Sequence, residues 1–187
     1  MFTRLVSLLL AAVLLCSCAT PALQPAEVPA ARLGLRLSPA SLGERVELQQ
    51  HLTIERHGKT DELDAALEVD PTHLELVGLA FGQRVVSLHY DGTKLTTWRH
   101  VMLPQQVKAE DILEDLQLTL WPIEAIRSAL PTGWRVEDQG LDRNLYLGDE
   151  LVCSIHYAGM PRWSGVVHLV NRRYQYSITI QSVDNPD

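Results

Sequence analysis

Histidines and their carboxylate neighbours are the first residues of this sequence whose chemistry could support catalysis or metal binding. The seven histidines occupy positions 51, 57, 73, 89, 100, 156 and 168. None has the His-x-x-x-His spacing that places two metal ligands on one face of a helix. His73 and Glu75 would share the solvent face of an expected strand, where a metal role and a purely solvated one are both open. The spacing predicts no metal site.

The sequence positions of Cys153 and of the remaining carboxylates predict structural rather than catalytic roles. Cys153 falls on the apolar side of an alternating strand, which predicts a buried thiol rather than a reactive nucleophile. The acids Glu110, Asp111, Glu114 and Asp115 cover the polar face of an expected helix and suit the positive end of its dipole. The chain has no Gly-x-Ser-x-Gly elbow and no glycine-rich phosphate loop. We therefore expect a protein that is not an enzyme and needs no cofactor.

The start of the chain has the pattern of an export signal. A short basic segment, residues 1–4, precedes an apolar run at residues 5–15. A resident transmembrane helix needs about 20 apolar residues, so this run fits the core of a secretion signal. The next residues, Leu15-Cys16-Ser17-Cys18, resemble a bacterial lipobox, which makes Cys18 the expected lipidation site. An ordinary secretory signal, cut near Ala19, is the alternative.

The lipobox resemblance implies an address as well as an anchor. Residues 1–17 would be removed, and bacterial lipoproteins carry three acyl chains on the cysteine, whereas one chain alone holds only marginally. Ala19 stands where an aspartate would retain a lipoprotein in the inner membrane, so the resemblance implies the periplasmic face of the outer membrane. Residues 18–44 contain a Pro- and Ala-rich stretch that predicts an extended tether.

Composition describes the rest of the chain as one globular domain without affinity for nucleic acid. The chain has 187 residues, of which 46% are hydrophobic, so residues 45–187 are long enough for a single domain. Its formal net charge is −7. Binding to nucleic acid depends on a basic surface, and this balance gives no reason to expect one.

Apolar residues alternate with a period of two on either side of a central segment, which is typical of half-buried strands. The first runs lie at residues 46–54 and 63–69, and Asp91-Gly92 is a strong hairpin signal. The last run is the clearest, with Tyr176 and Ile178 on its apolar side. The pattern predicts about ten strands, paired antiparallel because the turns are short.

The central segment has helical spacing instead. It predicts one helix near residues 109–120 and a second one opened by Pro122. The apolar face of an antiparallel sheet must be covered, and these two helices are the only obvious cover. A curved sheet that two short helices fill only in part would leave an apolar cavity. We expect that cavity to be lined by Ile112, Leu116, Leu120, Trp121, Ile126, Tyr176 and Ile178.

Two stretches resemble known bacterial proteins. Residues 73–135 resemble the LolB-like family of outer-membrane lipoprotein receptors, through Leu79-Ala80-Phe81-Gly82, the following strand and the helical insert. Residues 45–182 are more closely similar to an uncharacterised family of small lipoproteins often encoded beside aryl-polyene pigment genes. That likeness lies in Asp115-Leu116-Gln117-Leu118, Trp121-Pro122 and the closing Asn171-Arg172-Arg173-Tyr174-Gln175-Tyr176.

The resemblance implies a mainly β (α+β) half-open antiparallel barrel with a short two-helix insert around an apolar cavity. It also implies an exposed apolar loop, here Leu79 and Phe81, that touches membrane or cargo, whereas a Phe81 ring folded into the core is the alternative. The expected protein binds a lipid-like or acylated cargo and hands it to outer-membrane lipid, with a periplasmic LolA-like carrier as a candidate donor. The alternative is a non-catalytic scaffold lipoprotein with a filled core and no ligand.

Overall fold

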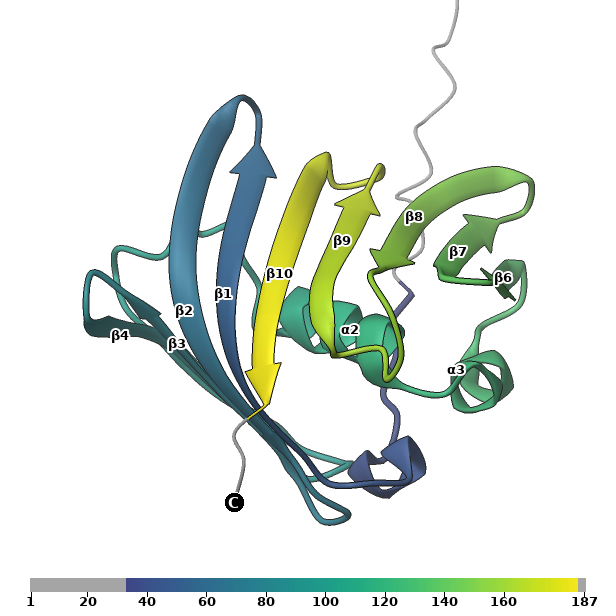
Figure 1. Cartoon of the computed structure of the whole chain (residues 1–187), viewed down its shortest axis with the longest axis horizontal. Coiled ribbons are helices and arrows are strands. Elements are labelled where there is room, and N and C mark those ends of the chain that lie inside the picture. Colours follow the sequence, from purple (N-terminus) through teal and green to yellow (C-terminus); the bar gives the residue numbers. More distant parts are fainter. Residues whose placement is uncertain (1–32, 185–187) are drawn as a thin grey trace, which may run out of the picture. The chain divides into compact units, whose positions relative to one another are not determined.

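A computed structural model of the chain describes residues 33–184 (Figure 1). The export signal, Cys18 and the stretch up to residue 32 lie outside the described residues. The described part is mainly β, with ten strands and two α-helices, which confirms the fold class expected from the sequence.

The elements follow one another in the order strands, helices, strands. The first half contains the 3-10 helix η1 (Pro39–Leu42) and the strands β1 (Val46–Arg56), β2 (Lys59–Val69), β3 (Leu74–Ala80), β4 (Gln83–Tyr90) and β5 (Leu95–Arg99). The helices α2 (Ala109–Leu120) and α3 (Ile123–Ala129) come next. The second half contains β6 (Trp134–Gln139), β7 (Asp142–Leu147), β8 (Glu150–Tyr157), β9 (Gly165–Asn171) and β10 (Tyr176–Asp184).

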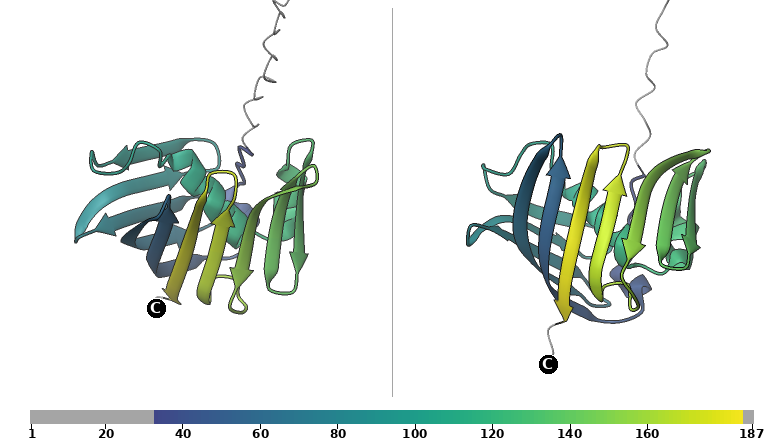
Figure 2. Two further views of the ribbon diagram at one scale, coloured as in Figure 1. Left: turned by 90° about the horizontal axis from the view of Figure 1, so that it is seen from above. Right: turned by 45° about the horizontal axis from the view of Figure 1, so that its top comes forward.

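All ten strands form one open antiparallel sheet with the order β5-β4-β3-β2-β1-β10-β9-β8-β7-β6. The first and last strands of the fold are therefore neighbours at its centre. Each half of the sheet is a run of hairpins, and β1 joins the halves by pairing with β10 over nine residue positions. The sheet curves around α2, which lies along its concave face (Figures 1 and 2). The edges at β5 and β6 do not meet.

The register places apolar residues on the concave face. Leu52 pairs with Ile180 and Ile54 pairs with Ile178 across the central β1–β10 ladder. Successive side chains of a strand point to opposite faces, so this register sends every even-numbered residue of both strands inward. The polar residues between them, such as Thr53 and Thr179, face outward. The alternation in the sequence thus determines which face of the sheet is covered.

Helix α2 crosses the concave face and is bound to the second half of the sheet at its end. Its first turn contains Glu110 and Asp111, which suit the positive end of the helix dipole. Its last carbonyl groups have no partner within the helix. Arg143 of β7 donates to the carbonyl oxygens of Leu118 and Trp121 at 2.6 and 2.8 Å, and the Tyr157 hydroxyl donates to that of Thr119 at 2.8 Å. The sheet itself therefore caps the helix.

The segment before η1 belongs to the folded domain, although the sequence analysis could not separate it from the tether. Leu33, Leu35 and Leu37 are all buried, with exposed fractions of 3, 1 and 5%. The amide of Gln117, on α2, accepts from the Leu37 backbone N–H at 3.0 Å and donates to its carbonyl at 2.9 Å. We call residues 33–37 the leucine strap. Because it packs into the same core as α2, the strap helps to fill the concave face.

Within residues 33–184, neither helix is long and apolar enough to cross a bilayer.

Candidate functional site

The concave face is tightly packed at one end and only half covered at the other. On β1, Val46 and Leu48 are buried, whereas Leu52 and Ile54 further along the strand are partly exposed. The same change occurs along β2, where Leu67 is buried and Leu63 is partly exposed. The partly buried apolar residues in this region are Leu52, Ile54, Leu63, Ala80, Ile112, Leu116 and Ile178. We call them the half-covered surface, and they are the first candidate for contact with an apolar ligand.

The residues expected to line a cavity fall into two groups. Leu120, Trp121, Ile126 and Tyr176 are buried in the packed core, and Trp121 and Ile126 have no exposed surface at all. A side chain that borders even a water-sized void keeps some accessible surface, so Trp121 and Ile126 border none. The strap, α2 and the sheet together fill the space that the sequence analysis left empty. Ile112, Leu116 and Ile178, in contrast, belong to the half-covered surface.

The two hollows described for this part of the chain are small. One, of about 210 Å³, lies on the outer face of β1–β3 beside Glu47, Glu68 and Glu75. The other, of about 140 Å³, lies between the β4–β5 pair and the start of α2, and Ile112 is one of its lining residues. Ligand pockets typically measure about 300–1,000 Å³. Neither of these two hollows could enclose a whole lipid, whereas the half-covered surface offers apolar side chains that a ligand could lie against.

Leucine-to-alanine substitutions on α2 should separate the packed side of the helix from its half-covered side. Leu113→Ala removes a side chain with no exposed surface, and we expect it to lower the free energy of unfolding by about 2–5 kcal/mol. Leu116→Ala should cost only about 1 kcal/mol, because its side chain is partly exposed already. Urea denaturation of both variants measures the difference. Equal losses would place Leu116 in the packed core.

Phe81 lies at the tip of the β3–β4 hairpin and points into solvent. Phe81 and Gly82 have φ angles of 52° and 72°, as a two-residue type I′ turn requires. The Phe81 side chain is 96% exposed, so the structure selects the projecting ring over the ring folded into the core. Leu79, the other residue expected in this loop, is 36% exposed. The hairpin thus presents an aromatic ring without any contact in the domain that would explain it.

One carboxylate of α2 faces the sheet rather than solvent. The sequence analysis placed Asp115 on the solvated face, but its Oδ2 accepts a hydrogen bond from the Tyr176 hydroxyl at 2.5 Å. That hydroxyl also accepts from the Asn171 side-chain amide at 3.2 Å. Arg56 lies above the Tyr176 ring, with its guanidinium carbon 4.9 Å from the ring centre. A four-residue polar group therefore joins α2 to the β1–β10 ladder.

Burial dominates the electrostatics of this group. It raises the pKa of Asp115 to about 7, with the charges of Glu114 and Asp111 adding to the effect and the Tyr176 hydrogen bond opposing it. Burial and the neighbouring Asp115 also raise the pKa of the Tyr176 hydroxyl. The raised pKa of Asp115 gives this contact a charge that changes near neutral pH. Because the group ties α2 to the β1–β10 ladder, its ionisation bears on the stability of that contact.

Cys153 is buried on the concave side, with 1% of its surface exposed, as its strand parity predicted. Burial raises the pKa of its thiol well above the ordinary value, and the nearby Asp115 and Glu114 add to the shift. The thiolate is the nucleophilic form, so burial and the raised pKa both disfavour reaction at this cysteine.

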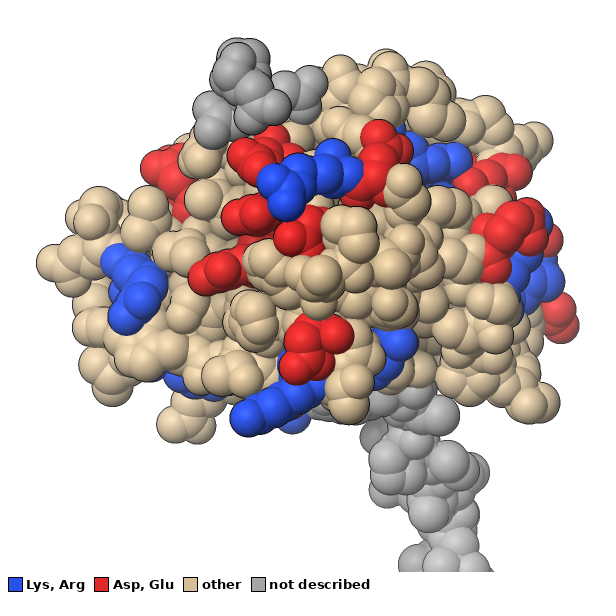
Figure 3. All heavy atoms as spheres, turned by 90° about the horizontal axis from the view of Figure 1, so that it is seen from below, with Lys and Arg blue, Asp and Glu red and all other residues tan. Residues whose placement is uncertain are grey.

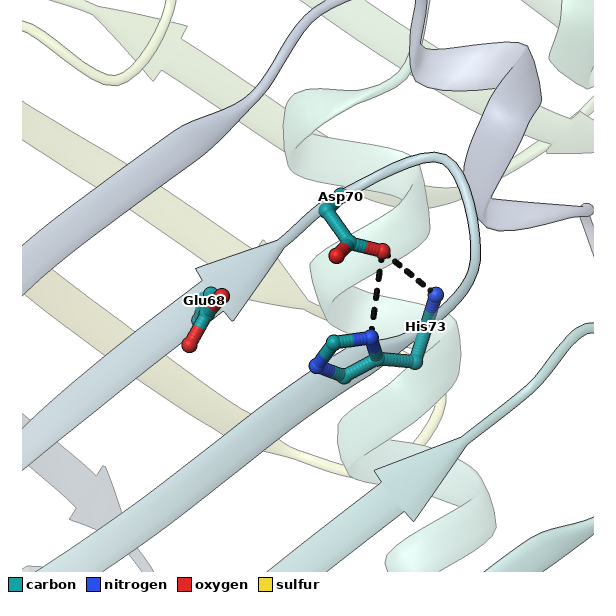
Figure 4. A group of neighbouring side chains, drawn as sticks. All are labelled: Glu68, Asp70 and His73. Atoms are coloured by element: carbon teal, nitrogen blue, oxygen red, sulfur yellow. Dashed lines mark hydrogen bonds and ion pairs between the residues drawn. The ribbon is translucent and has the colours of Figure 1, made fainter.

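Acidic and histidine side chains gather at the β2–β3 turn, where they stabilise the turn rather than form a metal centre. Glu68, Asp70 and His73 bring their ligand atoms within 4.8 Å of one another. However, Asp70 Oδ1 already accepts from the backbone N–H groups of Thr72 and His73 at 2.6 and 2.9 Å, and from the Thr72 hydroxyl at 2.7 Å. Figure 4 shows the His73 ring facing Asp70 while Glu68 stands apart. These hydrogen bonds, which hold the pKa of Asp70 well below its usual range, account for the cluster as a turn motif.

Two buried polar residues that hold the site together were missed from the sequence. Gln117, which binds the leucine strap, has no exposed surface. Arg143, which caps α2, is 1% exposed and forms an ion pair with Asp138 at 2.8 Å. A signal existed for Arg143, because it shares its strand parity with Leu145 and therefore must face the core. Gln117 gave no comparable signal, since its partner is the backbone of a distant segment.

These features define a class of protein: an open ten-stranded antiparallel sheet that wraps a helix and exposes an apolar hairpin. The chain belongs to the family described as "Protein of unknown function (DUF3261)", whose model matches residues 47–184. No curated protein matches the chain. Neither the likeness to LolB-like receptors nor a setting beside pigment genes is tested by these findings, and both stay predictions.

A search of solved structures found a distant likeness. The chain is similar to a DUF1329 family protein from Desulfovibrio piger ATCC 29098, with 9% sequence identity and a TM-score of 0.34. The match covers 78% of this chain and 87% of that one.

Proposed function

We propose that this protein is a periplasmic lipoprotein, held by Cys18 at the inner leaflet of the outer membrane, that binds a lipid-like or acylated cargo and hands it to that membrane. The observation that supports this most directly is the half-covered surface, where α2 and the strands β1, β2, β3 and β10 leave apolar side chains partly exposed. A periplasmic carrier similar to LolA is the proposed donor. The cargo would be either an acyl group of a lipoprotein or a polyene lipid.

The half-covered surface suits transfer rather than storage. Removing apolar surface from water is favourable by about 25 cal/mol per Å², so a chain laid against these side chains would be stabilised in proportion to its contact area. An open surface releases such a chain readily when a membrane competes for it. Leu79 and Phe81, at the end of the neighbouring hairpin, would make the first contact with that membrane. The transfer needs no covalent chemistry.

A second candidate function is that of a scaffold lipoprotein without a ligand. The filled core favours it, because the strap and the buried residues Trp121 and Ile126 occupy the space where an enclosed ligand would lie. In this case the half-covered surface would serve as a protein contact. The two functions differ in whether a lipid remains bound to the protein when it is purified from cells.

Mass spectrometry distinguishes them when it is applied to a soluble form that lacks residues 1–18, has an otherwise native sequence and is purified without detergent. We expect a lipid to accompany the native protein and to be lost from Ile54→Gln, which places a polar group on the half-covered surface. Val170→Gln is the matched control, because Val170 is 36% exposed on the outer face of β9. Native protein that carries no lipid under these conditions would favour the scaffold.

Replacing Cys18 with serine tests the anchor. We expect the Cys18→Ser variant to be unacylated, to keep its signal segment, and to be missing from the outer-membrane fraction. The comparison is with Cys16→Ser, which should be processed normally because Cys16 is not at the lipidation position. Metabolic labelling with palmitate, followed by membrane fractionation, measures both. Normal acylation of the Cys18→Ser variant would contradict the anchor.

A further inference from the structure

Exposed apolar side chains gather at one end of β3, β4 and β5. Leu79, Phe81, Trp98, Val101 and Met102 have exposed fractions of 36, 96, 41, 92 and 66%. The other large exposed apolar residues of the described chain are scattered over the turns and strands of the second half and the end of β10. We call the five residues at the β3–β5 end the two-turn surface.

The register shows why these residues are neighbours although they come from separate segments. The first turn is the β3–β4 hairpin, closed by the pair Ala80 and Gln83. The second directly follows β5, where the backbone N–H of Leu103 donates to the carbonyl of His100 at 3.1 Å. Val101 and Met102 are its two central residues. The His100 N–H in turn donates to the Val85 carbonyl at 2.8 Å, which fixes the second turn beside the start of β4.

Three cations, Arg84, Arg99 and Lys108, flank the two-turn surface on the β4–β5 side, whereas Asp64, opposite Leu79, and Glu110, at the start of α2, are the acids that border it. The guanidinium carbon of Arg84 lies 4.3 Å from the centre of the Trp98 ring. Arg99 donates to the carbonyl oxygens of Leu103 and Pro104, both at 2.9 Å, and thereby holds the second turn in shape. Lys108 ends the segment and is exposed. Between residues 79 and 109 the single acid is Asp91, which lies in the turn at the opposite end of β4.

The remaining surface of the first half of the sheet has the opposite charge. The outward positions of β1, β2 and β3 carry the acids Glu47, Glu55, Glu62, Asp64, Glu68 and Glu75. Figure 3 shows acidic side chains gathered near the middle of the face seen from below. In a chain with a net charge of −7, a basic apolar end is therefore a local exception. Its charge is complementary to an anionic partner, and its apolar side chains suit one with an apolar interior.

We propose that the two-turn surface docks on an anionic phospholipid bilayer, with Phe81, Val101 and Met102 entering the interface and the cations at its rim facing the headgroups. Aromatic and aliphatic side chains with neighbouring Lys and Arg are the composition by which proteins lie on anionic membranes. Trp98, stacked on Arg84, belongs at the headgroup level where indole rings collect. The proposal rests on the proposed function only in choosing a membrane as the neighbouring surface, and it assumes no cargo.

Docking in this orientation would bring the entrance of the small hollow close to the bilayer. The lining of that hollow includes the charged residues Arg99, Lys108 and Glu110 and the apolar residues Trp98, Val86 and Ile112. Ile112 is also part of the half-covered surface. A chain leaving the membrane, or returning to it, would therefore meet apolar side chains directly behind the second turn.

Spin labels on the full-length protein, purified from cell membranes and reconstituted into vesicles, test the docking. Single cysteines are introduced by Phe81→Cys and Met102→Cys, and the control is Met160→Cys, another exposed methionine on the opposite half of the sheet. Cys153 is buried and so does not compete for the label. In vesicles of phosphatidylcholine with phosphatidylglycerol, we expect labels 81 and 102 to become at least about threefold less accessible to a water-soluble relaxing agent. Label 160 should keep its accessibility.

The charge requirement is tested in the same system. Vesicles of phosphatidylcholine alone, or the additional substitutions Arg84→Gln and Lys108→Gln, should restore much of the water accessibility of labels 81 and 102. Labels 81 and 102 that stay as accessible as label 160 in anionic vesicles would overturn the proposal, as would protection that needs an added protein extract. Protection that is equal in neutral and anionic vesicles would refute its electrostatic part. If the protein is found not to be anchored, the labels are measured after mixing it with vesicles, which separates a failed anchor from failed docking.

Discussion

Replacing Arg143 with alanine should lower the free energy of unfolding by about 2–5 kcal/mol, because it leaves two buried carbonyl groups at the end of α2 without this donor and removes one of the two arginines that bind Asp138, the other being Arg162 at 2.7 Å. The Arg143 guanidinium is 1% exposed and binds both carboxylate oxygens of Asp138, at 2.8 and 3.0 Å. It also donates to two carbonyl groups at the end of α2. The substitution thus breaks an ion pair and uncaps the helix. Urea denaturation, followed by circular dichroism, measures the loss.

Arg135→Ala is the matched control for this prediction. Arg135 lies on the opposite face of the adjacent strand, pairs with Glu137 in solvent and covers the Tyr146 ring. An exposed pair of this kind contributes about 0–1 kcal/mol. Arg143→Lys should fall between the two alanine variants, since lysine keeps the charge but cannot reach four acceptors from one planar group. Equal losses for the two alanine variants would show that Arg143 does not hold the helix.

The sequence predicted the order of elements well because both periods in it have a direct physical cause. Alternation survives in β1 and β10, whose even-numbered residues all face the concave side of the sheet, and the helical period survives in α2. The Asp91-Gly92 hairpin follows from local chemistry, since Gly92 adopts a φ of 92° and the Asp91 carboxylate accepts from the backbone N–H groups of Thr93 and Lys94 at 2.9 and 2.7 Å. Such local signals do not depend on which distant segments meet, so they could be interpreted without a structure.

The filling of the concave face could not be predicted, because it depends on contacts between distant segments. Leu33, Leu35 and Leu37 alternate with small or polar residues, but nothing local shows that they pack beside α2, about 80 residues further along the chain. Without the strap, the sheet and helices leave an apparent vacancy, which is the cavity that the sequence analysis expected. Asp115 was misplaced for a related reason. A helical-wheel projection places Asp115 on the polar face of α2, and only its hydrogen bond with the Tyr176 hydroxyl explains its inward position.

The same partly buried carboxylate makes stability depend on pH in an unusual direction. Asp115 has a pKa of about 7 in the folded protein and about 4 when unfolded. Between these pH values the folded state keeps a proton on Asp115 that the unfolded chain releases. The contribution of Asp115 to stability is therefore greatest below about pH 4 and falls as the pH rises toward 7. Asp70 and Asp91, whose pKa values are lowered, have the opposite effect, but their window lies below that of Asp115.

We therefore expect the unfolding free energy to decrease by about 2–4 kcal/mol between about pH 5 and pH 8, and Asp115→Asn to abolish most of that decrease. Asparagine can still accept the Tyr176 hydrogen bond but carries no charge to bury, so the variant should be more stable than the native protein at pH 8. Glu110→Gln, at an exposed acid of the same helix, is the control and should leave the pH profile unchanged. Denaturation midpoints across this pH range measure all three proteins. A native profile that is flat, or that rises with pH, would show that Asp115 is ionised in the folded state and that its contact with Tyr176 is an ordinary charged hydrogen bond.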